Sequence, residues 1–317
     1  MAQLPLPSRR GVLLTGLLLG CLLPACGGDP ESQEQMAGQG ASVRLGSWNI
    51  RKLGHGPNKN YGQLAKVIQD SFDAVGIMEI MQNKGGHPGF DALREALGKG
   101  WEGMVTDSPR PRDDTGGAEF YGLFYRTALF KPCPGWEGKL VYVTDNDGGD
   151  AGTGENLWAR EPAYTCLRAG FRKAGVGTDF AMALYHAIFV QGRIGAITHE
   201  VAHVEDMFRQ MQEALPQEKD LLLFGDLNLD PPQLDRAIEY NTRTACGSST
   251  LDQYGELTGH CYDHVLIHDE VATPEVPGKA EVLDVRRYAE SNFVFYRTMS
   301  DHLPIRILMR IDLPDDD

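Results

Sequence analysis

Apolar and polar residues recur along the chain with two periods, one typical of strands and the other typical of helices. Residues 61–72, "YGQLAKVIQDSF", predict a helix, because Leu64, Val67 and Ile68 recur on one helical face. Short apolar runs bounded by polar residues predict strands, and "LLLFG" is the most apolar of them. We expect further helices at residues 90–98 and 196–215, and strands at residues 43–50, 73–79, 119–126, 179–189, 221–225, 262–267 and 303–311.

Strands and helices are interspersed without an internal repeat or a second linker, so the pattern predicts one α/β domain over residues 43–312. A hydrophobic content of 42% is sufficient for a sizeable core. The formal net charge of −14 argues against a large basic surface for nonspecific binding of nucleic acid. It does not argue against a local basic groove, because one phosphate site needs only a few cations.

The first 42 residues differ in composition from the rest. Arg9 and Arg10 precede an apolar stretch that is too short to span a bilayer comfortably, and Leu-Pro-Ala-Cys then resembles a bacterial lipobox. We predict a lipoprotein signal peptide over residues 1–26 with a lipid on Cys26, and a flexible polar tether over residues 27–42. The protein would then be exported and membrane-anchored or extracellular. The arginine pair also suits twin-arginine export, and an ordinary cleaved signal is the alternative.

Four cysteines follow the tether, and none has the pair spacing of a zinc site. An even number of cysteines in an exported chain predicts two disulfides. The sequence allows three pairings, of which we favour the sequential one, and free buried thiols are the alternative. The expected disulfides are Cys133–Cys166 and Cys246–Cys261.

A possible zinc site lies in "HEVAH", residues 199–203. Two histidines one helical turn apart can hold zinc, with Glu200 as the base of a protease. On a continuous helix, however, His199 and His203 would lie opposite the apolar stripe and face solvent. Asp252 is a conceivable third ligand, but no feature of the sequence requires it. The helical phase therefore disfavours a zinc protease.

A second set of polar residues is spread along the chain at the ends of expected strands. Oxygen ligands of this kind suit Mg²⁺, Mn²⁺ or Ca²⁺, and two histidines beside such a metal suit acid–base chemistry on a phosphate ester. Each residue alone is more often a turn residue or a buried core histidine. The set comprises Asn49, Glu79, Glu119, His186, Asp226, Asn228, Asp263, Asp301 and His302.

Seven motifs carry a resemblance to a known family. In order along the chain they are "WNIRKLG", "GIMEIM", "EFYGLFYR", "WAREP", "GDLNLD", "CYDHVLI" and "SDHLPI". Together they resemble the endonuclease/exonuclease/phosphatase superfamily, and most closely its deoxyribonuclease I-like branch. The resemblance covers nearly all of residues 43–312. It implies a four-layer α/β sandwich, in which two packed mixed β-sheets are flanked by helices.

The resemblance also implies roles for individual residues. His302 matches the general base that activates water, with Asp263 as its orienting partner. His186 matches the general acid that protonates the leaving oxygen, and Glu119 holds it. The divalent cations, Mg²⁺ or Mn²⁺, and the scissile phosphate are expected at Asn49, Glu79, Asp226, Asn228 and Asp301, and Arg160 matches a phosphate-binding residue.

The chain departs from the deoxyribonuclease branch in two places where that branch contacts the DNA minor groove. Met81 stands where the branch has an arginine, and Gly117 stands where it has a tyrosine. Both changes weaken the grip on duplex DNA. A substitute phosphate-facing patch is conceivable, although its residues are equally explained as ordinary surface charges. The residues of this patch are Arg51, Lys52, Arg110 and Arg112.

An acidic, glycine-rich loop at residues 144–156 resembles the calcium-binding loop of the same branch. Asp145, Asp147 and Asp150 are its candidate ligands for a structural Ca²⁺, and solvated turn residues are the equal alternative.

We therefore expect an exported, monomeric, metal-dependent phosphodiesterase, first of all a nuclease acting on DNA. A phosphodiesterase or phosphatase acting on phospholipid or small phosphate esters is the alternative, and the loss of the groove contacts favours it. A non-catalytic binding protein on the same fold is a third reading, which the complete pair of histidines disfavours.

Overall fold

The computed structural model describes residues 41–55, 58–107, 119–144, 157–173, 176–238, 241–243, 247–268 and 274–313. By its internal contacts the chain divides into two units, Met1–Gln39 and Gly40–Asp317. All described residues belong to the second unit, so the predicted signal peptide and Cys26 lie outside them. None of the helices in the described part is long and apolar enough to cross a membrane.

The first sheet has six strands in the described part of the chain, in the order β12-β13-β1-β2-β4-β3. β1 pairs in parallel with β2 and antiparallel with β13, so the sheet is mixed. The strands are β1 (Ser42–Leu53), β2 (Ala74–Met81), β3 (Trp101–Val105), β4 (Glu119–Arg126), β12 (Glu281–Val282) and β13 (Ile305–Arg310).

The second sheet has seven strands among the described residues, in the order β10-β11-β9-β8-β7-β5, with β6 also paired to β7. β8 and β9 are parallel, whereas β9 and β11 are antiparallel, so this sheet is mixed too. Its strands are β5 (Phe130–Pro132), β6 (Val141–Tyr142), β7 (Ala163–Lys173), β8 (Val176–His186), β9 (Leu221–Asp226), β10 (Asn241–Thr242) and β11 (Asp263–Ile267).

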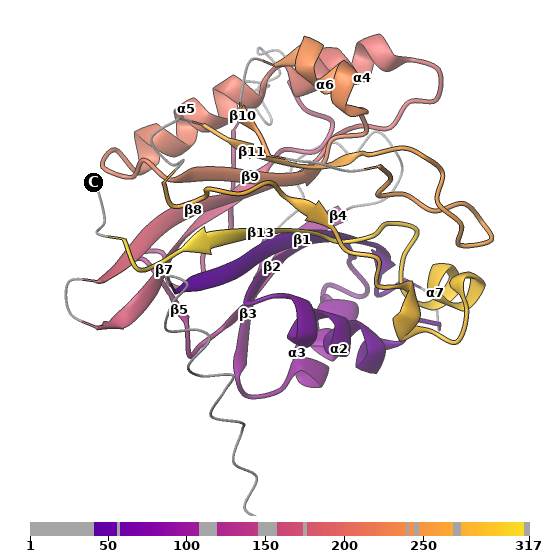
Figure 1. Cartoon of the computed structure of the whole chain (residues 1–317), viewed down its shortest axis with the longest axis horizontal. Coiled ribbons are helices and arrows are strands. Elements are labelled where there is room, and N and C mark those ends of the chain that lie inside the picture. Colours follow the sequence, from indigo (N-terminus) through magenta and orange to yellow (C-terminus); the bar gives the residue numbers. More distant parts are fainter. Residues whose placement is uncertain are drawn as a thin grey trace, which may run out of the picture. The chain divides into compact units, whose positions relative to one another are not determined.

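The two sheets pack face to face, and helices cover their outer faces (Figure 1). α2 and α3 pack on the first sheet, and α4, α5 and α6 pack on the second. This is the predicted four-layer α/β sandwich. The helices are α2 (Tyr61–Ser71), α3 (Pro88–Leu97), α4 (Ile194–Val201), α5 (Val204–Ala214), α6 (Pro231–Ala237), α7 (Asn292–Thr298) and the 3₁₀ helix η3 (Arg286–Tyr288).

β8 shows how the sequence specifies these layers. Phe180 and Leu184 point into the core between the sheets, whereas Ala181 and Tyr185 pack under the helices. Side chains of a strand alternate between its two faces, so a strand buried on both sides is apolar at nearly every position. The same alternation directs His186, two residues after Leu184, toward the space between the sheets.

The helix predicted at residues 196–215 is wrong, because the structure has two helices there. α4 ends at Val201, and α5 begins at Val204. Between them the backbone N–H of His203 donates to the Glu200 carbonyl, a bond to the third residue back that tightens the turn. The apolar stripe nevertheless runs through both helices, since Val201, Val204 and Phe208 are all fully buried.

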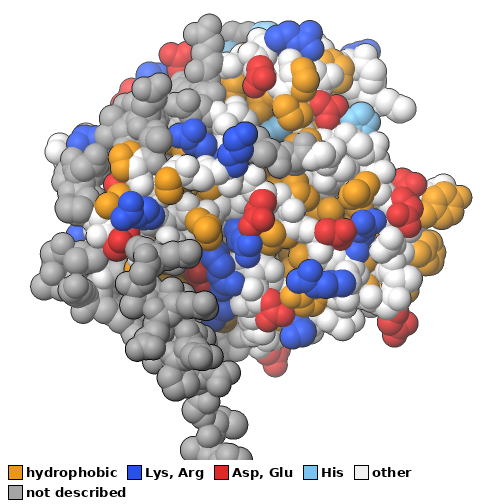
Figure 2. Space-filling view, viewed as in Figure 1, with side chains coloured by type: hydrophobic (Ala, Val, Ile, Leu, Met, Phe, Trp, Pro, Cys, Tyr) orange, Lys and Arg blue, Asp and Glu red, His pale blue; other side chains and the backbone are white. Residues whose placement is uncertain are grey.

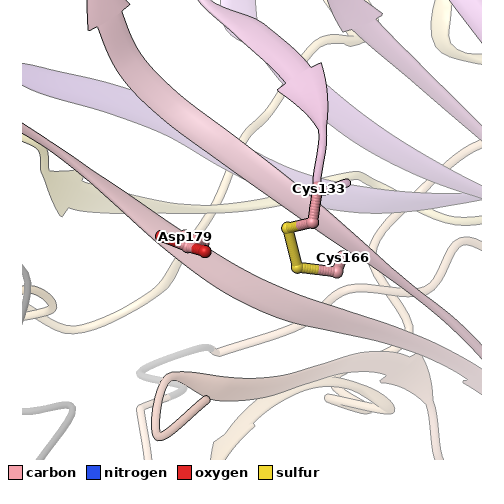
Figure 3. A group of neighbouring side chains, drawn as sticks. All are labelled: Cys133, Cys166 and Asp179. Carbon is pink, nitrogen blue, oxygen red and sulfur yellow. A yellow bond between two sulfur atoms is a disulfide. The ribbon is translucent and has the colours of Figure 1, made fainter. Parts of the chain in front are cut away.

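The predicted disulfide Cys133–Cys166 is confirmed, and Figure 3 shows it beside Asp179. Cys133 directly follows β5 and Cys166 lies in β7, its neighbour in the sheet. The two sulfurs are bonded to each other, so this cluster offers no thiolate to a metal. The Oδ1 atom of Asp179 lies 3.8 Å from Nε of Arg168. Cys261 is also disulfide-bonded. Its predicted partner, Cys246, lies outside the described residues.

Candidate active site

Polar side chains replace apolar ones where five strands approach the same end of the core between the sheets. Leu45, Tyr121, Leu184, Phe224 and Val265 all belong to that core. Each of these strands also has a polar residue two or four positions away from the core residue. Because side chains alternate between the two faces of a strand, the polar residue lies on the same face as the core residue. In the same order, these residues are Asn49, Glu119, His186, Asp226 and Asp263.

His186 and Glu119 form the first histidine–carboxylate pair. His186 ends β8, Glu119 begins β4, and the ring Nδ1 lies 2.9 Å from Glu119 Oε2. The imidazole is 5% exposed. Burial and Arg160 lower the pKa of His186, but Glu119 and Asp226 outweigh them and raise it. Burial raises the pKa of Glu119, but His186, Arg160 and Lys52 together hold it below its usual value.

His302 and Asp263 form the second pair. Asp263 begins β11, and its Oδ2 lies 2.9 Å from Nδ1 of His302, which lies in the loop before β13. Burial alone would lower the pKa of this imidazole, but the carboxylates of Asp263 and Asp226 hold it well above its ordinary value. The Trp48 indole fixes the loop by donating to the His302 carbonyl at 2.9 Å.

Asp226 lies between the two pairs. Its Oδ2 is 3.6 Å from Nε2 of His186 and 3.5 Å from Nε2 of His302. β9 explains this position, because Asp226 is registered opposite both His186 on β8 and Asp263 on β11. Burial raises the pKa of the Asp226 carboxyl, and Asp263 adds to that effect, while the two histidines oppose it. The Nε2 atoms of both rings thus face one common point.

Asn49 links Asp226 to Glu79 at the other sheet. Its Nδ2 donates to Asp226 Oδ2 at 3.1 Å and to Glu79 Oε1 at 3.0 Å. Glu79 lies at an irregularity in the pairing of β2 with β4 and has a left-handed backbone, with φ +58°. A left-handed glutamate is strained, and the irregularity interrupts the alternation of β2. Glu79 therefore faces Asn49, although a regular strand would not place it there.

Asn228 also has a left-handed backbone, with φ +51°. Its N–H donates to Asp226 Oδ1 at 3.1 Å and its Nδ2 donates to the Ala187 carbonyl at 2.9 Å. Asp301 precedes His302, and its Oδ2 lies 3.3 Å from Arg51 Nε. These two predicted residues thus adjoin the histidine pairs, one through Asp226 and the other through the chain.

Arg160 lies against the first pair. Its Nε is 3.1 Å from Glu119 Oε2, and its Nη1 donates to the carbonyls of His186 and Ala187. In this position it braces both members of the pair. A role in binding phosphate stays a prediction.

The residues present fit a divalent cation. Asp226, Asp263 and His302 offer ligand atoms that all lie within 4.8 Å of one another. The Oδ1 atoms of Asp263 and Asp301 are buried and have no hydrogen-bond partner in the described part of the chain. Buried carboxylate oxygens are costly without a partner, and oxygen ligands of this kind are those that Mg²⁺ and Mn²⁺ prefer.

Sequence reasoning missed two residues of the centre. The Tyr121 hydroxyl accepts the His186 backbone N–H at 3.1 Å, and burial raises its pKa well above the usual value. Ser300 donates to the Asn49 carbonyl at 2.5 Å and accepts the His302 N–H at 3.0 Å. Both left a signal in the sequence, since Tyr121 shares a strand face with Glu119 and Ser300 directly precedes Asp301.

The "HEVAH" segment forms no comparable site. His199 is exposed, its ring centroid lies 5.3 Å from that of His203, and Glu200 is turned toward the core. Glu200 accepts hydrogen bonds from the Tyr185 hydroxyl and from the backbone N–H groups of Ile188 and Ala159. A carboxylate held in this way cannot act as a base on a zinc-bound substrate.

Several expected residues lie outside the described part of the chain. They are Arg110, Arg112, Gly117 and the calcium-loop residues Asp145, Asp147 and Asp150.

Met81 is described. It ends β2, is 7% exposed and lies opposite Glu119 in the sheet register.

Solved structures similar to this fold include an endonuclease/exonuclease/phosphatase family protein from Bacteroides thetaiotaomicron. The TM-score is 0.57 at 19% identity, covering 87% of this chain and 100% of that one. Another is TDP2 from D. rerio complexed with a single-strand DNA product, with a TM-score of 0.55 at 13% identity, covering 84% and 98%. The chain therefore has the fold of the endonuclease/exonuclease/phosphatase proteins, as its motifs predicted.

Among curated proteins, the chain is similar to a deoxyribonuclease from Thioalkalivibrio sp. (strain K90mix). The two are 26% identical over 281 residues, which cover 84% of this chain and 71% of that protein. No protein-family model matches the chain.

Proposed function

We propose that this protein is a divalent-metal-dependent phosphodiesterase that hydrolyses DNA. The observation that carries the proposal is the convergence of two histidine–carboxylate pairs on Asp226 Oδ2, at 3.5 and 3.6 Å from the two Nε2 atoms. One phosphate ester at that point would meet a proton acceptor on one ring and a proton donor on the other.

The two pairs divide the acid–base work. Asp263 holds Nδ1 of His302 and so directs Nε2 toward the substrate, where it takes a proton from the attacking water. Glu119 holds Nδ1 of His186 in the same way, and Nε2 of His186 gives a proton to the leaving oxygen. Asn49 and Asn228 orient Asp226 by hydrogen bonds.

A divalent cation held by Asn49, Glu79, Asp226 and Asp301 would supply positive charge against the phosphate oxygens as the ester bond breaks. Asp263 and His302 also offer ligand atoms close to Asp226, but in this proposal they form the acid–base pair and do not hold the cation. Mg²⁺ or Mn²⁺ fits these carboxylates best. A structural Ca²⁺ at the loop with Asp145, Asp147 and Asp150 is part of the same proposal, and it rests on the residue types alone.

The choice of DNA rests on the named relatives. The curated relative is a deoxyribonuclease, and the solved TDP2 structure holds a single-strand DNA product. Met81 favours a second candidate, a phosphodiesterase or phosphatase acting on phospholipid or small phosphate esters. It stands at the position where the deoxyribonuclease branch has a groove-binding arginine, and a buried methionine cannot contact a phosphate electrostatically.

One panel of substrates separates these functions. Duplex DNA, single-stranded DNA, RNA, sphingomyelin vesicles and a chromogenic phosphodiester are each incubated with Mg²⁺, Mn²⁺, Ca²⁺ or EDTA. We expect DNA cleavage with Mg²⁺ or Mn²⁺ that EDTA abolishes. Turnover of vesicles or of the small diester without DNA cleavage would favour the second candidate, and metal-independent turnover would contradict both.

We also propose that the protein is an exported lipoprotein, monomeric and anchored through Cys26. The support is the lipobox-like sequence and a disulfide between Cys133 and Cys166, which is typical of oxidising compartments. Cell fractionation of the natural protein and of Cys26→Ser tests it. The variant should move from the membrane fraction to the soluble exported fraction, and an unchanged distribution would contradict the anchor.

A further inference from the structure

A cavity of about 470 Å³ lies beside the catalytic centre, and we call it the basic–aromatic pocket. It is formed by residues that follow the regular part of β1, by the turn at Tyr254 and by α7. Its volume is within the range of small-ligand sites in proteins. The lining residues that matter here are Arg51, Lys52, Lys59, Tyr254, Phe293 and Arg297.

The pocket is joined directly to the candidate metal ligands. The Arg51 N–H donates to Asn49 Oδ1 at 3.1 Å, and its Nε is 3.3 Å from Asp301 Oδ2. The Lys52 N–H donates to Glu79 Oε2 at 3.0 Å. A polymer whose scissile phosphate lies at the centre would therefore place its next residues in the basic–aromatic pocket.

Positive charge is concentrated here in an acidic protein. Arg51, Lys52, Lys59 and Arg297 line the pocket without a carboxylate in the described lining, although the chain carries a formal charge of −14. On the face that Figure 2 shows, acidic and basic side chains are interspersed. Burial lowers the pKa of Lys59 to about 8, and a bound anion would favour its charged form. A phosphate group matches this charge.

The aromatic lining points to a flat ligand. Tyr254 and Phe293 are 63% and 51% exposed, so their rings are accessible to a ligand in the pocket. The Arg51 guanidinium lies 4.6 Å from the centroid of the Tyr296 ring, and that of Arg297 lies 6.0 Å from the centroid of Phe293. Aromatic rings in such an arrangement can stack against nucleic-acid bases, and the neighbouring guanidinium groups can hold the phosphates.

In a duplex both faces of each base are covered by neighbouring base pairs, whereas in a single strand they are accessible. An aromatic pocket therefore selects unpaired nucleotides, and its cations hold the adjoining phosphates. We propose that the basic–aromatic pocket binds an unpaired nucleotide next to the scissile phosphate, so that single-stranded nucleic acid is the preferred substrate. This inference rests on the proposed function, because it names the substrate class of the same centre.

The first test removes the stacking surface. Tyr254→Ala with Phe293→Ala should raise the KM for a labelled single strand by at least about tenfold, the order expected for lost base stacking, with little change in kcat. A strand of the same length with abasic residues beside the cleavage site has no bases to stack. The KM for this abasic strand should be high with the natural protein and should be the same with the doubly substituted variant. Leu308→Ala, another exposed apolar residue, is the control.

The second test removes a cation and leaves the rings in place. Arg297→Ala should weaken the intact and abasic strands equally, and reduce the slope of log KM against log salt by about 0.7, as for one lost phosphate contact on a single strand. All of these residues are exposed, so circular dichroism and melting temperature should match those of the natural protein. The different responses of the two strands separate base contacts from phosphate contacts.

The outcomes separate this inference from the proposed function. If the natural protein cleaves DNA but Tyr254→Ala with Phe293→Ala leaves the KM for the single strand unchanged, or weakens the abasic strand equally, the pocket assignment is wrong and the nuclease stands. A preference for duplex over single strand would also overturn the pocket assignment. If no nucleic acid is cleaved while vesicles or a small diester are, the proposed function fails, and the pocket assignment fails with it.

Discussion

The candidate active site, called the centre below, and the "HEVAH" segment each place two histidines near carboxylates, but they do so by different means. In the centre, His186 and His302 come from distant parts of the chain and their Nε2 atoms face the same Asp226 oxygen. In the segment, His199 and His203 are neighbours in the sequence, and a break between α4 and α5 separates them.

The carboxylates differ even more than the histidines. Asp263 and Glu119 point at histidine Nδ1 atoms and leave Nε2 for chemistry. Glu200 points inward and accepts three hydrogen bonds, which join α4 to Tyr185 of β8, to Ile188 just after β8 and to Ala159. Side chains that converge from several strands therefore form the candidate site. In the "HEVAH" segment, by contrast, Glu200 holds α4 against the neighbouring backbone and Tyr185, so its role is structural. Four predictions test this contrast.

The largest effect is expected in the histidines of the centre. His302→Ala and His186→Ala should each lower kcat by on the order of 10²-fold or more, because a general base or acid is lost. The fold should persist, since both residues lie at the end of a strand or in a loop. Steady-state rates on the best DNA substrate, together with thermal melts, measure both effects. Near-natural rates in either variant would exclude the acid–base mechanism.

A smaller effect is expected in the carboxylate behind His302. Asp263→Asn should lower kcat by about 10- to 100-fold, because the imidazole loses the partner that fixes its orientation. Asp263 also raises the pKa of His302, and the general base must be unprotonated. In the natural protein, activity should therefore rise with pH through a pKa above the ordinary histidine value, and the variant should move this acidic limb to lower pH.

The matched control is Asp206→Asn, which removes the carboxylate 3.1 Å from His203 in the "HEVAH" region. It should change neither kcat nor the pH profile of kcat/KM. An acidic limb that stays in place in Asp263→Asn would mean that His302 is not the group that titrates.

Glu200 should matter for stability and not for chemistry. Glu200→Ala removes the acceptor of three hydrogen bonds and leaves the Tyr185 hydroxyl buried without it, which should lower the free energy of unfolding by about 3 kcal/mol. The activity of the folded fraction should change little. Urea unfolding and rates measured at low temperature test the two parts. A large loss of kcat at unchanged stability would mean that Glu200 has a catalytic role.

The smallest effect is expected in the histidines of the segment. His199→Ala with His203→Ala should alter stability by less than about 1 kcal/mol, because His199 is exposed and the pair between His203 and Asp206 is partly solvated. Activity and bound metal should not change. Elemental analysis of the purified protein decides the matter, since stoichiometric zinc that is lost in this variant would restore the protease reading.

Much of the fold could be predicted from the sequence, because strand patterns are local. "LLLFGD" is β9 with its last residue turned to the centre, and other candidate site residues also lie at or beside the ends of such runs. The helix over residues 196–215 was wrong for the opposite reason. Its apolar stripe continues through the turn, so periodicity alone does not reveal that the backbone changes direction at His203.

Other features depend on contacts between distant residues and left little trace in the sequence. The inward orientation of Glu200 depends on Tyr185, and the left-handed backbone of Glu79 depends on an irregular strand pairing. The basic–aromatic pocket was missed as well, although Arg51 and Lys52 were noted as a conceivable patch. Its aromatic residues come from the turn at Tyr254 and from α7, about 200 and 240 residues further along the chain.

The left-handed backbones of Glu79 and Asn228 have a consequence for the evolution of this protein. Each such residue costs roughly 1–3 kcal/mol, and glycine would adopt the same conformation without that strain. Selection for heat tolerance alone would therefore favour glycine at both positions, and would yield a hardier protein without the Glu79 carboxylate and the Asn228 amide. Conversely, lineages that retain both side chains would be under continuing pressure to regain stability through substitutions elsewhere in the domain.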